Sequence, residues 1–300
     1  PEAELPDTTV DQLPPSLRAA CARAGWTTLT PVQARGIPRL LDGRNMMIQA
    51  RTGSGKTGAF PLPMLELLDP RRAGRQALVL VPTRELAKQV YDDAVKLFGD
   101  SGLRAVAVYG GVGYGSQVEA LKRGAHVVIG TPGRVLDHLL KRTFALDQLD
   151  ALVFDEADRM LSMGFYPDMR KLKRYLPARD LHTCMFSATF PAFVIRTARE
   201  FIDEPEFVNL SSDHVHVSDV EHVVYVVDGM DKDRSLVRII EVENPTAAII
   251  FCNTKQRVHY VNVVLQRFGY DADELSSDLT QGQREQVLDR ARLQSQLKLE

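Results

Sequence analysis

The fold of this 300-residue chain is decided by one stretch, Ala50-Arg51-Thr52-Gly53-Ser54-Gly55-Lys56-Thr57. The stretch follows a short apolar run and opens a segment of helical character. Its glycines let backbone N–H groups turn inward around phosphate oxygens, and the helix that follows presents its positive end to the same anion. The strict pattern has glycine where this chain has Ala50, so the stretch is a variant of the phosphate-binding loop. Strand, loop and helix in this order predict a nucleotide-binding α/β domain.

Nearly continuous apolar runs lie on both sides of this loop. Runs without polar alternation are typical of strands buried on both faces of a parallel sheet. Segments with helical spacing lie between them, such as residues 85–98, where Leu86, Val90 and Ala94 recur on one face. This alternation predicts a doubly wound α/β sheet. We expect its strands at residues 45–49, 77–81, 105–109, 126–129, 151–154 and 183–186.

A polar, turn-prone segment separates this pattern from a second α/β pattern. We expect an N-terminal domain over residues 1–209, a linker over 210–220 and a second domain over 221–300. The second part has only about 80 residues, which is short for a doubly wound domain. We therefore expect the second domain to be incomplete. Its predicted elements are strands at 223–227 and 247–251 and a helix at 258–268.

The overall composition excludes several classes of protein. A net charge of −2 is neither strongly basic nor strongly acidic, so any nucleic-acid site must be local. Cys21, Cys184 and Cys252 lie far apart without metal-ligand spacing, which predicts reduced thiols, and Cys184 and Cys252 lie in apolar runs typical of a core. No apolar run approaches the roughly 18 residues of a membrane span. These features predict a soluble cytoplasmic protein that does not engage a membrane.

Acidic residues follow the strand predicted at residues 151–154, in the sequence Asp155-Glu156-Ala157-Asp158. A strand that ends in carboxylates beside a phosphate loop is the Walker B arrangement. Asp155 is placed to hold Mg²⁺ through water, and Glu156 to polarise an attacking water. In the loop itself, Lys56 supplies a charge for the β- and γ-phosphates, and Thr57 supplies a hydroxyl for Mg²⁺.

Other polar clusters also follow predicted strands. They are residues 82–85, 110–111, 131–134 and 187–189. Ligands of open α/β sheets bind outside the carboxyl ends of the strands. One edge of this sheet carries more polar sites than a nucleotide alone would occupy, which indicates a second, extended ligand beside it.

Taken in order, these motifs resemble those of the DEAD-box helicases over residues 10–292. Each motif alone is short, but nine in the family's order form a specific pattern. The motifs are the Q motif at 25–33, motif I at 50–57, Ia at 82–87, the Gly110-Gly111 pair, Ib at 131–134, the Asp-Glu-Ala-Asp at 155–158, Ser187-Ala188-Thr189 as motif III, motif IV at 250–254, and Gln-x-x-Arg at 281–284.

The resemblance implies an ATP-dependent RNA helicase with two RecA-like domains, the second incomplete here. RNA-stimulated hydrolysis of ATP with Mg²⁺ would drive local duplex unwinding or the remodelling of RNA–protein complexes, including those of ribosome assembly. The implied catalytic residues are Lys56, Asp155 and Glu156, and the implied ATP-binding residues are Trp26, Thr30, Gln33, Arg51, Thr52, Gly53, Ser54, Gly55, Lys56 and Thr57. Asp158, Ser187 and Thr189 would couple the γ-phosphate to domain closure.

By the same resemblance, RNA would be held through its phosphates and 2′-hydroxyls, independently of sequence. The residues implied are Pro82, Thr83, Arg84, Gly110, Gly111, Thr131, Pro132, Gly133 and Arg134, with Asn253, Thr254, Gln281 and Arg284 in the second domain.

The family's motif V and its arginine-rich motif VI are not among these 300 residues. An arginine finger contributes roughly 10³–10⁵ to the rate in comparable enzymes. We therefore expect this polypeptide to bind ATP, to hydrolyse it poorly and not to unwind RNA.

Three other functions compete with this one. Another superfamily 2 motor, acting on DNA, shares the motor motifs but not the Q motif. A nucleotide-gated RNA clamp would work without turnover, which Lys56 and Glu156 argue against. A small-molecule kinase explains neither the Q motif nor the second domain.

Overall fold

A computed structural model describes residues 7–51, 53–210, 221, 223–229, 231–280, 282–284, 286–287 and 289–290. The chain forms two compact units, Pro1–Val217 and Ser218–Glu300. In the described part of the chain, no helix combines the length and the apolar character needed to cross a bilayer.

The first unit is built on a sheet of parallel strands in the order β3-β4-β2-β5-β6-β1-β7. This confirms the doubly wound α/β fold and all six strands predicted in this unit. The seventh strand, β7, was not predicted, because its exposed Phe207 and polar neighbours break the apolar run. The strands are β1 Met46–Gln49, β2 Ala77–Leu80, β3 Ala105–Val108, β4 Val127–Gly130, β5 Ala151–Phe154, β6 His182–Ser187 and β7 Glu206–Asn209.

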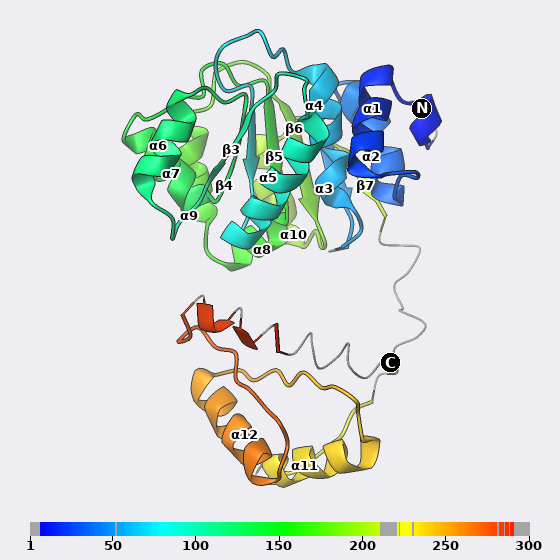
Figure 1. Cartoon of the computed structure of the whole chain (residues 1–300), viewed down its shortest axis with the longest axis vertical. Coiled ribbons are helices and arrows are strands. Elements are labelled where there is room, and N and C mark those ends of the chain that lie inside the picture. The colour runs from blue at the N-terminus through cyan, green and yellow to red at the C-terminus, as the bar shows by residue number, and fades with distance from the viewer. Residues whose placement is uncertain are drawn as a thin grey trace. The chain divides into compact units, whose positions relative to one another are not determined.

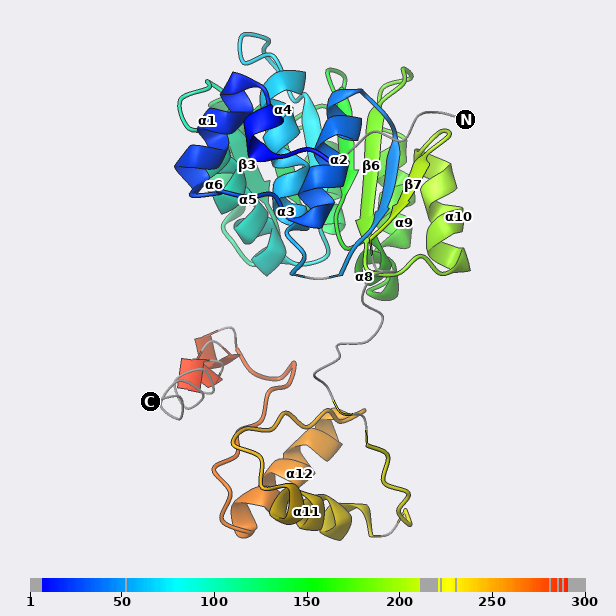
Figure 2. The same cartoon turned by 90° about the vertical axis from the view of Figure 1, so that its right-hand side faces the viewer.

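Helices cover both faces of this sheet (Figures 1 and 2). Alternate residues of a strand point to opposite faces, so Met46 and Ile48 join one core while Met47 joins the other. The first core packs under η1 Val10–Gln12, α1 Pro15–Ala24, α2 Pro31–Leu41, α3 Lys56–Ala59, α4 Pro61–Leu67 and α5 Arg84–Phe98. The second packs under α6 Tyr114–Lys122, α7 Pro132–Leu140, α8 Ala157–Ser162, α9 Tyr166–Lys173 and α10 Ala192–Phe201.

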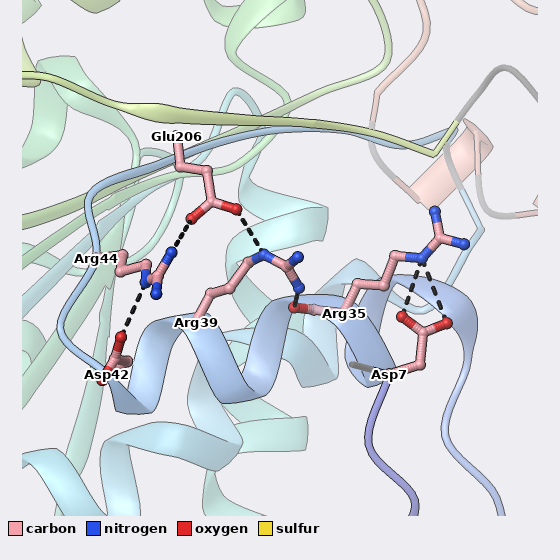
Figure 3. Close-up of polar contacts among 6 residues, drawn as sticks. All are labelled: Asp7, Arg35, Arg39, Asp42, Arg44 and Glu206. Atoms are coloured by element: carbon pink, nitrogen blue, oxygen red, sulfur yellow. Dashed lines mark hydrogen bonds and ion pairs between the residues drawn. The ribbon is translucent and has the colours of Figure 1, made fainter. Parts of the chain in front are cut away.

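An ion-pair network joins α2 to the edge strand β7 (Figure 3). The Glu206 carboxylate accepts from Arg39 Nε at 2.7 Å and from Arg44 Nη1 at 3.0 Å. Arg44 Nε also donates to Asp42 at 2.9 Å, and Arg39 Nη1 donates to the Arg35 carbonyl at 2.8 Å. The network ties the helix that begins the nucleotide site to the last strand of the sheet.

The second unit contains α11 Lys232–Glu243 and α12 Lys255–Arg267, and α12 confirms the helix predicted there. The strands predicted at 223–227 and 247–251 are wrong for this structure: among the described residues of the unit, none belongs to a strand. A strand needs a neighbour to satisfy its N–H and C=O groups, and no hydrogen-bonded ladder forms between these two segments.

Side chains of these two segments are open to solvent. Val226 is 95% exposed and Phe251 is 92% exposed, whereas residues of the first unit's strands are mostly buried. Cys252 is only half-buried, so its prediction as a core residue is wrong, while Cys184 is buried as predicted. The predicted linker lies outside the described residues apart from Leu210.

Candidate functional site

The sheet order sorts the predicted motifs along one edge. Because all strands are parallel, their carboxyl ends lie at the same edge. The neighbours β3, β4 and β2 lead into Gly110-Gly111, residues 131–134 and residues 82–84. Next along the edge, β5, β6 and β1 lead into the acidic motif, Ser187-Ala188-Thr189 and the phosphate loop. The motifs after β5, β6 and β1, which include the phosphate loop, therefore form one group, and the motifs after β3, β4 and β2 form a second group next to it.

The phosphate loop has the backbone that its glycines allow. Gly53 has a φ of +79° and Gly55 a φ of +86°, both in the left-handed region that favours glycine. A Cβ on Gly55 would lie 2.6 Å from the Thr30 hydroxyl, so the loop packs directly against the start of α2. The Oγ atoms of Ser54 and Thr30 are buried and have no hydrogen-bond partner among the described residues. Such groups fit an anion or a polar ligand in the loop. Thr52 lies outside the described residues.

Gln33 connects α2 to this loop. Its Nε2 donates to the Gly55 carbonyl at 3.1 Å, and its Oε1 accepts from the Thr30 backbone N–H at 3.0 Å. Gln33 is 4% exposed, so it is not a surface residue at a helix end. Gly58 lies beside it: an added Cβ there would be 2.3 Å from the Trp26 ring and 2.5 Å from Gln33 Nε2. Gly58 was not among the predicted site residues, yet its lack of a side chain lets Trp26 and Gln33 pack against α3.

The buried charges of the site lie at the ends of β1 and β5. Lys56 is 5% exposed and its Nζ donates to the Ala50 carbonyl at 3.0 Å. Asp155 is 2% exposed. Burial raises the pKa of Asp155 to about 6, although the Lys56 charge opposes the rise. A carboxyl group this poorly solvated favours a nearby cation.

Glu156 has a strained backbone, with φ 54° and ψ 50° in the left-handed region. Its side chain is held by Arg159, whose Nη1 lies 3.1 Å from Glu156 Oε2. Arg159 was not among the predicted site residues. A surface arginine three residues along a helix gives no signal that separates it from an ordinary ion pair.

Thr57 and Asp155 have the oxygen donors that suit Mg²⁺. In the described residues, no three His, Cys, Asp or Glu side chains gather into a metal-binding group. Mg²⁺ commonly takes one or two protein oxygens and completes its shell with water and substrate phosphates. The buried carboxylate of Asp155 beside the phosphate loop fits that arrangement.

Asp158, Ser187 and Thr189 lie together, as predicted for the coupling group. Asp158 Oδ2 accepts from the Thr189 hydroxyl at 2.7 Å and from the Thr189 backbone N–H at 3.0 Å, and Ser187 Oγ accepts from the Asp158 N–H at 3.1 Å. Burial alone would raise the pKa of Asp158, but the hydrogen bonds from Thr189 and Ser187 outweigh it and lower the pKa. Asp158 is therefore an ionised acceptor that joins α8 to the end of β6.

The polar cluster at residues 82–84 lies beside the Gly110-Gly111 pair. Thr83 caps α5 by accepting from the Leu86 N–H at 3.3 Å, with Pro82 just before it and Arg84 in the first turn. Gly111 has a φ of +84°, and an added Cβ would lie 2.7 Å from Arg84 Nη1. The Gly110-Gly111 turn therefore approaches the Arg84 guanidinium closely.

The third cluster begins α7. The Thr131 N–H donates to the Val108 carbonyl at 3.1 Å, Pro132 opens the helix, and Gly133 lies near the Asp168 carboxylate. Arg134 Nη1 is buried without a hydrogen-bond partner among the described residues.

The predicted residues of the second unit are less organised. Asn253 and Thr254 are exposed, and Thr254 caps α12 by accepting from the Arg257 N–H at 3.2 Å. Arg284 is half-buried, with its Nε 3.4 Å from the Ser276 carbonyl. Gln281 lies outside the described residues.

Comparison with known families agrees with this geometry. Residues 30–197 match the model described as DEAD/DEAH box helicase, and residues 231–299 match the helicase conserved C-terminal domain.

Curated relatives and solved structures are similar to the chain over most of its length. The DEAD-box ATP-dependent RNA helicase CshA of Bacillus licheniformis is 40% identical over 273 residues, which cover 91% of this chain and 56% of the relative. The ATP-dependent RNA helicase DeaD of Escherichia coli is 44% identical over 268 residues, which cover 89% of this chain and 42% of the relative. A crystal structure of a DEAD box protein from Methanococcus jannaschii matches with a TM-score of 0.65 and 32% identity, covering 97% of this chain and 78% of that one. The chain thus spans about half the length of the curated relatives.

Proposed function

Because the chain belongs to the DEAD/DEAH box helicase family, we propose that it binds ATP and RNA and uses RNA-stimulated hydrolysis to open short duplexes or remodel RNA–protein complexes. The names of the relatives CshA and DeaD support ATP and RNA as ligands.

One observation carries the proposal. The carboxyl edge of the sheet has the phosphate loop after β1, the acidic motif after β5 and Ser187-Ala188-Thr189 after β6, and a separate group of Gly, Thr and Arg residues after β3, β4 and β2. The first group accounts for a nucleotide. The second offers backbone N–H groups, hydroxyls and guanidinium groups, which are the usual partners of a phosphodiester backbone.

For ATP, the loop N–H groups and Lys56 would bind the phosphates. Gln33 has an amide that can both donate and accept, which suits the edge of adenine. Mg²⁺ held by Thr57 and Asp155 would neutralise charge on the phosphates. Glu156, held by Arg159 at 3.1 Å, would orient the attacking water and accept its proton.

The state of the γ-phosphate would reach the rest of the molecule through Asp158, Ser187 and Thr189. Their hydrogen bonds run from α8 to the end of β6, beside the phosphate loop. The Ala50 N–H also donates to the Ser187 carbonyl at 2.9 Å, so the start of the loop and this group are directly joined.

For RNA, Arg84, Gly110, Gly111, Thr131 and Arg134 would hold the backbone of one strand. Contacts of this kind carry no sequence information, so we expect binding to be largely independent of sequence and to weaken with salt. The 2′-hydroxyl would separate RNA from DNA.

The test is the ATPase rate with single-stranded RNA, with DNA of the same sequence, and with neither. It is measured for the protein as its organism makes it and for the 300-residue chain in parallel. We expect RNA to stimulate strongly the ATPase of the protein as its organism makes it. We expect slow ATP turnover in the 300-residue chain, since the arginine-rich motif is not among the 300 residues. Stimulation by DNA but not by RNA would contradict RNA as the substrate and leave the ATP-driven motor assignment standing. RNA binding without ATP turnover in either protein would favour a nucleotide-gated clamp.

We also propose a cytoplasmic location and an RNA–protein complex, such as a ribosome precursor, as the target. Cell fractionation with crosslinking to RNA tests both proposals. Recovery of the protein with membranes, or without RNA, would contradict them.

A further inference from the structure

A tyrosine outside the family motifs lies between two of the proposed RNA-binding segments. Tyr114 is the first residue of α6, four residues after Gly110. Its ring stacks on the His138 ring of α7, with centroids 4.3 Å apart and planes at 7°. The same ring receives the Arg134 guanidinium at 5.5 Å and the Lys141 ammonium at 4.2 Å from its centroid.

Arg134 and His138 lie on α7, and Lys141 caps its C-terminal end on the same face. Arg134, His138 and Lys141 are spaced by four and three residues, which places them in one row. Tyr114 therefore packs along the face of α7 that carries Arg134, and cation–π attraction holds the guanidinium over the ring.

A buried polar path joins the same elements behind the ring. Gln117 Nε2 donates to the Tyr109 carbonyl at 3.0 Å, directly before Gly110. Its Oε1 lies 3.3 Å from His138 Nε2, and His138 Nδ1 lies 2.7 Å from the Thr143 hydroxyl. Gln117 is 5% exposed and His138 is fully buried. Burial, and after it the Arg134 charge, lowers the pKa of His138, which favours the neutral ring.

We infer that Tyr114 is a positioning residue for RNA, which holds the Arg134 guanidinium in a fixed place on α7 beside the Gly110-Gly111 turn. This inference rests on the proposed function. Tyr114 acts through Arg134 rather than on the nucleic acid. We assign the role to its ring, because the described contacts with His138, Arg134 and Lys141 are all made by the ring, whereas the hydroxyl has no hydrogen-bond partner among the described residues.

A plain packing role makes a different prediction. If Tyr114 only filled space, its loss would lower stability and affect ATP and RNA alike. A positioning role lowers RNA affinity alone, and it reduces the salt dependence because one phosphate contact is lost or weakened.

The experiment measures binding of a single-stranded RNA and of an ATP analogue to the 300-residue chain, with Tyr114→Leu, Tyr114→Phe and the control Tyr175→Leu. Tyr175 is also partly exposed, but it lies before β6, at the amino end of the strands. We expect Tyr114→Leu to lower RNA affinity on the order of 10-fold and to reduce the salt slope by about 1. ATP-analogue affinity should not change, and Tyr114→Phe and the control should match the unmodified chain.

A double-mutant cycle tests the route through Arg134. In an Arg134→Ala background, Tyr114→Leu should change RNA affinity by less than about twofold. A full additional loss in that background would overturn the inference, as would an unchanged salt slope in Tyr114→Leu or a defect in Tyr114→Phe as large as in Tyr114→Leu. If the unmodified chain itself shows no salt-dependent RNA binding, the proposed function fails and the inference fails with it. If that binding is present and Tyr114→Leu retains it, only the inference fails.

Discussion

At the scale of single residues, the nucleotide site depends on two buried groups of opposite charge. Lys56 and Asp155 are 5% and 2% exposed, and each is costly to bury without the other or a ligand. Their motifs are local in sequence, so both could be predicted from spacing alone.

Replacement of Lys56 by Ala should remove the charge that binds the β- and γ-phosphates. We expect ATP hydrolysis to fall by about 10²-fold or more, as for the loss of one strong electrostatic donor. Isothermal calorimetry with an ATP analogue and single-turnover hydrolysis would measure the effect. Lys122→Ala is the matched control, because Lys122 is two-thirds exposed and, within the described part of the chain, pairs only with Glu119 at 3.1 Å. Equal effects of the two substitutions would contradict the assignment.

Replacement of Gly55 by Ala should disturb the loop for two reasons. The left-handed backbone costs a side chain about 1–2 kcal/mol, and the new Cβ would lie 2.6 Å from the Thr30 hydroxyl. We expect a lower unfolding midpoint and weaker binding of an ATP analogue. Gly43→Ala is the control, since Gly43 also has a positive φ, +74°, but nothing lies within 4 Å of its added Cβ. It should lose stability and keep nucleotide affinity.

Other residues of the site could not be predicted because their roles depend on distant partners. Gln117 and His138 are 21 residues apart, and Tyr109 is reached only through the fold. Nothing in their sequence spacing brings them together. The stack on Tyr114 likewise requires α6 and α7 to be side by side.

At the scale of elements, the ion pairs of Glu206 join β7 to α2, the helix that begins the nucleotide site. Glu206 accepts from Arg39 and Arg44, and the Arg39 side chain is 8% exposed. Burial alone would raise the pKa of Glu206, but the hydrogen bonds from the two arginines outweigh it and lower the pKa. A lowered pKa means that this carboxylate adds stability above its ordinary pKa, and that this contribution is lost as the pH falls through the lowered value.

Glu206→Gln should therefore destabilise the chain at pH 7 by about 1–2 kcal/mol, between the values for exposed and buried ion pairs. Urea unfolding followed by circular dichroism at several pH values measures this. The difference from the unmodified chain should narrow as the pH falls below about 4. Asp42→Asn is the control: the Asp42 side chain contacts Arg44 in the network of Figure 3 and is 57% exposed, so the change should alter stability by at most about 0.5 kcal/mol. A difference that stays constant with pH would contradict the ionic explanation.

Strands could be predicted where the apolar residues form a continuous run, and could not be predicted where no such run exists. The runs of β2, β4 and β5 are buried on both faces and those of β1 and β6 nearly so, which is the pattern that the sequence displays, while the apolar run of β3 is half-buried on one face. In β7 only Val208 is buried, so no run marks it. In the second unit, residues 223–227 and 247–251 have strand-like composition, but composition cannot supply the neighbouring strand that a ladder needs.

At the scale of the whole molecule, the two units should differ in how their backbones are protected from solvent. The strands of the first unit are hydrogen-bonded on one or both sides, whereas residues 223–228 and 247–252 of the second lie outside any ladder.

Hydrogen exchange followed by mass spectrometry on the full chain should show this difference. Amides in β1, β2 and β5 should exchange only with global unfolding, while those at 247–252 should exchange many-fold faster. Peptides covering α12 serve as an internal control, because they belong to the same unit and are helical. Protection at 247–252 as strong as in β1 would show that these residues form a ladder in solution.

The position of β3 as the outermost strand has a consequence for ligand length. The proposed RNA contacts follow β3, β4 and β2, and adjacent strands lie about 4.8 Å apart, so the three strand ends span on the order of 10 Å. A row of contacts this short fixes a small footprint, whatever the length of the polymer that crosses it. In this unit, affinity should rise with oligonucleotide length until the three strand ends are filled. Beyond that length, additional nucleotides should contribute only through the number of positions at which the chain can bind.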